Sequence, residues 1–140
     1  MIVDANVLLY ATEATAPHHE VARRWLEEAL NGPSRVGLPW ASLLAFQRIA
    51  THPRVSERPL GTAEAWQMVE RWIAAPSAWI PVPGPRHQEI LGRLLTSTNA
   101  RGNLVPDAHL AALAIENGVG VCSFDSDFAR FPQAGWFAPA

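Results

Sequence analysis

The chain begins with MIVDANVLLYA, residues 1–11, and this stretch decides the fold that the sequence predicts. Met1 to Val3 is a short apolar run of the kind that forms a buried strand. Asp4 ends the run, and residues 5–11 are expected to turn into a short helix. A strand that passes directly into a helix is typical of α/β proteins, whose functional sites form beyond the carboxyl ends of their strands.

The same alternation of short apolar runs and amphipathic segments continues along the chain. Further strands are expected at residues 36–38, 78–82 and 119–124, and helices at 17–30, 39–50, 62–76, 85–95 and 106–116. Thr62 is the expected N-cap of its helix, and Trp25, Trp66 and Trp72 stand at core spacing. The tail from Pro132 is expected to be irregular. We therefore expect a single domain spanning residues 1–140, a three-layer α/β/α sandwich with a mainly parallel central sheet.

The composition excludes several classes of protein. All 11 basic residues are Arg, so the chain lacks the Lys ammonium group that a P-loop or a Schiff base needs. A single Cys excludes both an internal disulfide framework and a Cys-rich zinc site. No apolar run approaches the roughly 20 residues that a membrane span needs, and no basic region precedes the first strand. We expect a cytoplasmic protein with no membrane association.

The four Asp residues fall in three segments, each at a strand end or a helix start. Asp4 follows the first strand, Asp107 begins a helix, and Asp125 follows the strand at 119–124, with Asp127 close behind. Carboxylates that converge repel one another unless one is protonated or a cation joins them. Mg²⁺ suits such a site, with Mn²⁺ as the other candidate, because both prefer oxygen ligands. The predicted reaction is hydrolysis of a phosphodiester, in which the metal lowers the pKa of water and offsets phosphate charge.

Each of these aspartates also has an ordinary structural explanation. Asp4 suits the N-cap of the helix that follows it, and Asp107 is favourable in the first turn of a helix. Asp125 and Asp127 are suited to a turn and a cap before Phe128. The combination of three acidic segments therefore carries more weight than any one of them.

Three segments resemble the acidic motifs of a PIN domain. They are Val3-Asp4-Ala5-Asn6, the stretch NLVPDAHLAALA at residues 103–114, and SFDSDF at residues 123–128. Over its full length the chain resembles a VapC-type toxin, the ribonuclease half of a bacterial type II toxin–antitoxin pair.

This resemblance implies a Mg²⁺-dependent endoribonuclease, usually a homodimer, that is inhibited by a small VapB-type antitoxin. It implies that Asp4 and Asp107 are the principal metal ligands, and that Asp125 and Asp127 complete the acidic pocket, with Asp125 also at the metal. Asn6 would orient the first motif, and Ser123 would form hydrogen bonds within the third.

One position departs from the pattern of the family. Members commonly carry a Glu in the helix after the second strand, where this chain has Ala45. A methyl group neither binds a metal nor accepts a proton, so a second metal ion is in doubt. Glu116 is a poor substitute because nine residues along a helix put it on the face opposite Asp107. Asp127 is the better candidate for the extra carboxylate.

The remaining charged and polar residues are less informative. Arg48, Arg54 and Arg101 are candidate contacts for RNA phosphates or for the antitoxin, although a solvated surface explains them equally well. His87 is expected to be packed, His109 points away from Asp107, and Cys122 is expected to be an inert core thiol. Trp40 and Trp136 are candidates for a partner surface.

Two alternatives to a ribonuclease remain at this point. A PIN-like fold without the Glu at position 45 can act as a binding module for RNA or a protein. A small phosphatase is the other, but its usual Asp-x-Asp after the first strand is absent, since Asp4-Ala5-Asn6 offers one carboxylate. The sequence does not identify the RNA target.

Overall fold

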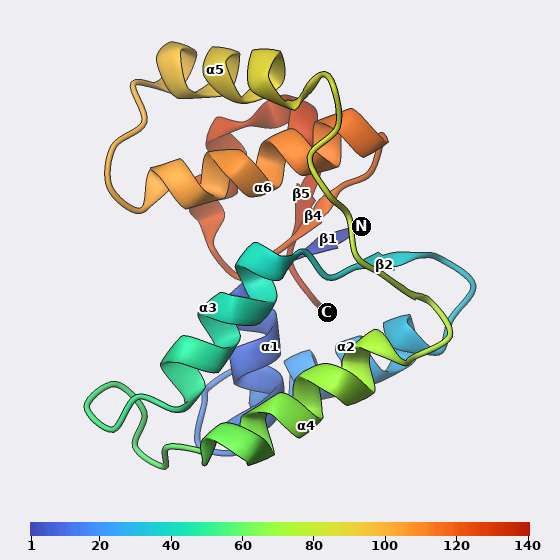
Figure 1. The fold of residues 1–140 in the computed structure, drawn as a ribbon, viewed down its shortest axis with the longest axis vertical. Helices are drawn as coiled ribbons and strands as arrows, with labels where there is room; N and C mark the ends of the chain where they lie inside the picture. The colour runs from blue at the N-terminus through green and yellow to red at the C-terminus, as the bar shows by residue number, and fades with distance from the viewer.

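A central sheet of five short parallel strands organises the computed structural model, which describes residues 1–140 (Figure 1). The strand order is β3-β2-β1-β4-β5, and all four neighbouring pairs are parallel. The strands are β1 (Ile2–Val3), β2 (Val36–Gly37), β3 (Ala78–Trp79), β4 (Val121–Cys122) and β5 (Trp136–Phe137). The four strands that the sequence predicted, β1 to β4, are each shorter than the expected run, because only two residues of each run pair in the sheet.

Six α-helices and two 3-10 helices connect the strands. They are α1 (Ala5–Thr12), α2 (His19–Leu30), α3 (Trp40–Ala50), α4 (Thr62–Ile73), α5 (His87–Thr98), α6 (Leu104–Asn117), η1 (Ser126–Arg130) and η2 (Pro132–Ala134). Figure 1 shows α5 and α6 on one side of the sheet and α1 to α4 on the other. No helix is long and apolar enough to cross a membrane.

The core lies on both faces of the sheet, as a three-layer sandwich requires. Ile2 and Val121 belong to a cluster with α5 and α6, whereas Val3 and Cys122 belong to a cluster with α1 to α4. Successive residues of a strand point to opposite faces, so two-residue strands still supply both cores. The predicted fold class is therefore confirmed.

The tail from Pro132 is not irregular, and that expectation was wrong. It contains η2 and then β5, which pairs with β4 and forms one edge of the sheet. Gly135, with φ of 62°, makes the turn into the strand. Gly120 allows a close approach, since a Cβ there would lie 2.6 Å from the carbonyl oxygen of Gly135. A strand of two residues is too short to show a sequence period, so the pattern did not reveal it.

Two smaller expectations were also wrong. Gly61, rather than Thr62, is the N-cap of α4, and no side chain caps the helix there. Trp66 is 40% exposed, because Ala65 and Val69 form the buried face of α4. The helix α6 ends at Gly118 with φ of 65°, the left-handed conformation that glycine commonly adopts after a helix.

A substitution of Phe46 tests how α3 packs in the core cluster that it forms with α1, α2 and α4. Its side chain is fully buried, and its ring meets that of Trp72 edge-on with centroids 4.8 Å apart. We expect Phe46→Ala to lower the free energy of unfolding by about 3–5 kcal/mol through lost contacts and a residual cavity. Urea denaturation followed by circular dichroism measures the change.

Leu44→Ala is the matched control, because Leu44 lies on the same helix and is 56% exposed. Its effect should stay within about 0.5 kcal/mol. Equal losses for the two variants would show that α3 is not packed as described.

Candidate active site

Asp4 and Ser123 meet at the carboxyl edge of the sheet, where β1 and β4 end side by side. The register pairs Val3 with Cys122, so the residues that follow, Asp4 and Ser123, leave the sheet together. The Ser123 hydroxyl donates to Asp4 Oδ2 at 2.7 Å, and Asp4 Oδ1 accepts from the backbone N–H of Ala5 at 2.7 Å. Asp4 is thus both the N-cap of α1 and one wall of an acidic pocket.

Ser123 is the hub that joins the first and third acidic segments. It is fully buried, and its Oγ accepts from Asn6 Nδ2 at 3.1 Å and from the Asp125 N–H at 2.9 Å while it donates to Asp4. These three bonds use the full capacity of a hydroxyl. Asn6 Oδ1 in turn accepts from the Phe124 N–H at 3.2 Å. The network therefore fixes the orientation of Asp4, Asn6 and the backbone that leads to Asp125.

Three carboxylates gather in front of this network. Asp107 comes from the first turn of α6, and Asp125 is the N-cap of η1 with its Oδ1 accepting from the Asp127 N–H at 2.9 Å. Asp107, Asp125 and Asp127 each place one carboxylate oxygen within 4.8 Å of the other two. Carboxylate oxygens at this spacing are the ligands that hard divalent cations prefer. The cluster is therefore an arrangement that can hold a metal ion.

The electrostatics of the cluster show how unfavourable its negative charge is. Burial, followed by the charges of Asp4, Asp125 and Asp127, raises the pKa of Asp107 to about 7. Burial also raises the pKa of Asp4, against the opposing effect of hydrogen bonds from Ser123 and the Ala5 N–H. A cation bound among these groups would relieve the repulsion, as would a proton.

The structure thus brings all four aspartates to one edge of the sheet, with one distinction among them. Asp4 does not belong to the set of three oxygens within 4.8 Å, and its two oxygens are engaged by Ser123 and Ala5. Its direct ligation of a metal, like that of Asp107 and Asp125, stays a prediction. The Arg48, Arg54 and Arg101 side chains are exposed and form no ion pair.

Two histidines, His87 and His109, and Glu116 form a separate contact between α6 and the start of α5. His87 Nε2 lies 3.1 Å from His109 Nδ1, and Glu116 accepts from the N–H groups of Gly84 and Arg86. His87 is packed as expected, at 8% exposure, and none of these residues joins the acidic cluster. Cys122 is buried, and burial raises the pKa of its thiol to about 12, so it is an inert core residue.

Sequence reasoning missed the support that β5 gives to the site. Trp136 Nε1 donates to the Ser123 carbonyl oxygen at 2.9 Å, and the Ser123 N–H donates to the Phe137 carbonyl at 3.0 Å. The edge strand therefore holds the hub residue by its backbone. The only available signal was the apolar pair Trp136-Phe137 after a glycine, which is too short to be distinguished from a loop.

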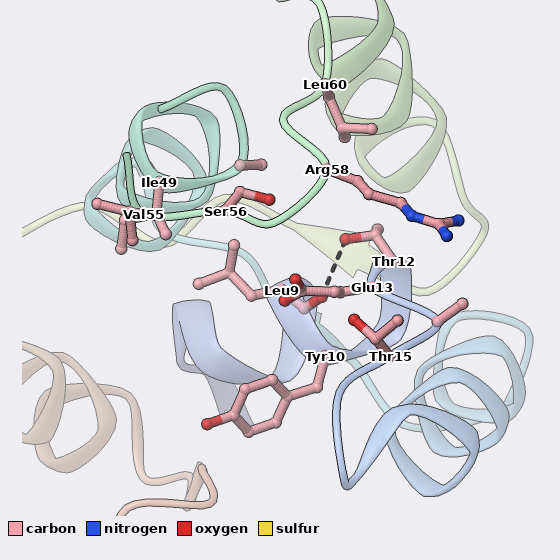
Figure 2. A pocket seen from close by; sticks show the side chains of 12 residues that line it. Leu9, Tyr10, Thr12, Glu13, Thr15, Ile49, Val55, Ser56, Arg58 and Leu60 are labelled. Atoms are coloured by element: carbon pink, nitrogen blue, oxygen red, sulfur yellow. Dashed lines mark hydrogen bonds between the residues drawn. The ribbon is translucent and has the colours of Figure 1, made fainter. Parts of the chain in front are cut away.

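A hollow of about 360 Å³ lies away from the cluster, at the far end of α1 (Figure 2). Its lining comes from the end of α1, the end of α3 and the loop after it, and is mostly apolar, with Leu9, Ile49, Val55 and Leu60. Glu13 and Arg58 are its only charged residues. The hollow gathers no catalytic set of groups, so the acidic cluster is the candidate active site.

Comparisons with known proteins identify the family to which this fold belongs. The PIN domain family model matches residues 1–134. Ribonuclease VapC37 of Mycobacterium tuberculosis is 51% identical over 138 residues, which cover 99% of this chain and 96% of the relative. Ribonuclease VapC33 of the same species is 40% identical over 139 residues, which cover 99% of this chain and 97% of that relative.

Solved structures share the fold at much lower identity. VapBC2 from Rickettsia felis, bound to a DNA fragment from its promoter, aligns with a TM-score of 0.73 at 15% identity over 99% of this chain and 98% of that one. Mycobacterium tuberculosis VapC20, described as a sarcin–ricin loop cleaving toxin, aligns with a TM-score of 0.68 at 16% identity. The alignment covers 91% of this chain and 92% of that one. The chain therefore belongs to the PIN-domain family, within the group of VapC ribonucleases.

Proposed function

We propose that this protein is the toxin of a type II toxin–antitoxin pair and hydrolyses RNA phosphodiester bonds as a metal-dependent endoribonuclease. The observation that carries the proposal is the convergence of the Asp107, Asp125 and Asp127 oxygens within 4.8 Å, beside Asp4. The relationship to VapC ribonucleases at up to 51% identity supports the same activity. A small phosphatase finds no support in this family.

Asp107, Asp125 and Asp127 would hold the metal, with Asp4 as a further candidate ligand, and Mg²⁺ fits this donor set, as does Mn²⁺. When bound, such a cation supplies a water of lowered pKa and offsets charge on the scissile phosphate. Ser123 keeps the Asp4 carboxylate in place, and Asn6 and the N–H of Ala5 complete its support. These positioning residues prepare the pocket, so that little reorganisation accompanies substrate binding.

The partners of the proposed activity are RNA, a VapB-type antitoxin and a second copy of the chain. The VapBC2 complex among the structural relatives supports an antitoxin partner. The exposed Arg48, Arg54 and Arg101 are candidates to contact RNA phosphates or the antitoxin. A single domain acting in the cytoplasm fits this role.

A second candidate function, a binding module without turnover, rests on Ala45. This residue is half-buried on α3, which packs against α1, the helix that Asp4 begins. If the missing Glu had abolished turnover, the fold would still present its surface to RNA or protein. The three clustered carboxylates favour an active enzyme.

Asp107→Asn tests the nuclease directly, because it removes one charge with almost no change in shape. We expect RNA cleavage in the presence of Mg²⁺ to fall by more than the roughly 10- to 100-fold loss that follows removal of an outer-shell partner of a metal. Sequencing of RNA ends after induced expression measures it. Glu89→Gln, an exposed carboxylate paired with Arg93 on α5, is the control and should cleave normally. Undiminished cleavage by the Asp107→Asn protein would contradict the proposal.

The raised pKa of Asp107 predicts how stability of the metal-free protein depends on pH. Between its usual pKa of 3.8 and about 7, the folded protein binds this proton more tightly than the unfolded chain. The contribution of this carboxyl to stability is therefore favourable at low pH and is lost as pH rises toward 7. Between pH 5 and pH 8, the melting temperature of the wild-type protein should therefore fall by more than that of the Asp107→Asn protein.

Calorimetry with and without Mg²⁺ measures this difference. Mg²⁺ at pH 8 should raise the melting temperature of the wild type more than that of Asp107→Asn. If the melting temperatures of the two proteins depend on pH in the same way, the pKa of the Asp107 carboxyl is not raised by the fold.

Ala45→Glu separates the enzyme from the binding module. Because three carboxylates already cluster, we expect the added Glu to change the rate of RNA cleavage by no more than severalfold. Ala45→Gln, which adds the same bulk without charge, is the matched control. A large gain with Glu but not with Gln would mean that the natural site is degenerate and that the binding module is the correct description.

A further inference from the structure

Two tryptophans stack on each other at the surface where α3 meets α4. Trp40 is 41% exposed and Trp66 is 40% exposed, and their rings lie at 12° to each other with centroids 6.3 Å apart. The rings are therefore nearly parallel but strongly offset, and a large part of each indole stays open to water. Tryptophan is highly buried on average, so two exposed indoles in contact need an explanation.

Trp40 begins its helix at the same edge of the sheet as the acidic cluster. The register pairs Ile2 with Gly37, which sets Pro39 level with Asp4, and Trp40 is the next residue. Neighbouring strands lie about 4.8 Å apart, so Asp4 and Trp40 start adjacent helices at one edge. These helices, α1 and α3, pack against each other, and Figure 1 shows both leaving the sheet on the same side.

A positive charge follows the indole along the same helix. Arg48 lies eight residues after Trp40 on α3, about 12 Å along the axis, and its exposed side chain forms no ion pair. An exposed aromatic ring and an exposed guanidinium on one helix are groups that single-stranded nucleic acid uses, with a base on the ring and a phosphate further along the strand on the charge. Net charge of −2 gives no general attraction for RNA, so stacking matters more here.

We propose that Trp40, backed by Trp66, is a stacking platform for an unpaired nucleobase next to the scissile phosphate. The proposal rests on the proposed ribonuclease function and adds to it a preference for unpaired bases. A base within a duplex already has both faces covered, whereas a base in a loop is free to lie on an indole. The platform orients the strand, and the carboxylates act on the phosphate beside it.

The test measures binding to RNA that differs only in its bases. The protein carries Asp107→Asn to prevent cleavage, and the probes are fluorescein-labelled octauridine and an abasic ribose–phosphate strand of equal length. Trp40→Ala should weaken octauridine binding by on the order of tenfold and leave abasic binding unchanged. Trp40→Phe should restore most of the loss, which guards against a folding defect.

Leu44→Ala is the matched control, because this exposed residue is one turn from Trp40 on α3 and has no aromatic face. It should bind both strands normally. The proposed stacking platform is wrong if octauridine does not bind. It is wrong as well if Trp40→Ala weakens the binding of both strands equally, or if it changes the binding of neither strand. It is also wrong if Trp40→Ala disrupts only self-association or antitoxin binding, since the indoles would then form a protein interface.

The two proposals fail separately. If a Trp40→Ala protein with Asp107 intact cleaves RNA with the KM of the wild type, the nuclease function stands and the stacking platform is wrong. Wild-type protein that prefers octauridine to the abasic strand through Trp40, but does not cleave any RNA in Mg²⁺, retains the platform and loses the nuclease function.

Discussion

The parallel pairing of β1 with β4 is the constraint on which the candidate active site depends. It leaves Asp4 and Ser123 side by side at the sheet edge, although 119 positions separate them in the chain. Ser123 then orients Asp4, Asn6 and the Asp125 backbone with one hydroxyl. The carboxylates do not attract one another; backbone pairing and core packing bring them together and hold them there.

This arrangement is electrostatically unfavourable, and the rest of the fold compensates for it. Burial first, and then the charges of the neighbouring aspartates, raise the pKa of Asp107. The packing of α6 on the sheet offsets this cost. Four alanines of α6 are fully buried and let the helix pack closely on the sheet: Ala108, Ala111, Ala112 and Ala114. Proteins commonly accept such local conflicts at functional sites and offset them elsewhere. Here the conflict lies where a cation and a phosphate are expected to meet.

Much of the fold was predictable because it depends on local patterns. Apolar runs located four of the five strands, and the expected helix at 106–116 located most of α6 and therefore Asp107. The prediction failed where local pattern is weak or tertiary contact decides. The strand β5 has only two residues, and Trp66 lies beside the buried stripe of α4 rather than within it. The hydrogen bond from Trp136 to Ser123 had no sequence signal at all.

The sequence by itself determined the order of the six α-helices and of four of the five strands, the placement of each aspartate at a strand end or helix start, and the absence of any Lys chemistry. These properties depend on residue type and on neighbours within a few positions. Only the tertiary structure decided that Asp107, Asp125 and Asp127 form the close set of oxygens while Asp4 is engaged by Ser123. Distances between separate segments depend on strand register and helix packing, which sum many weak contacts over the whole chain.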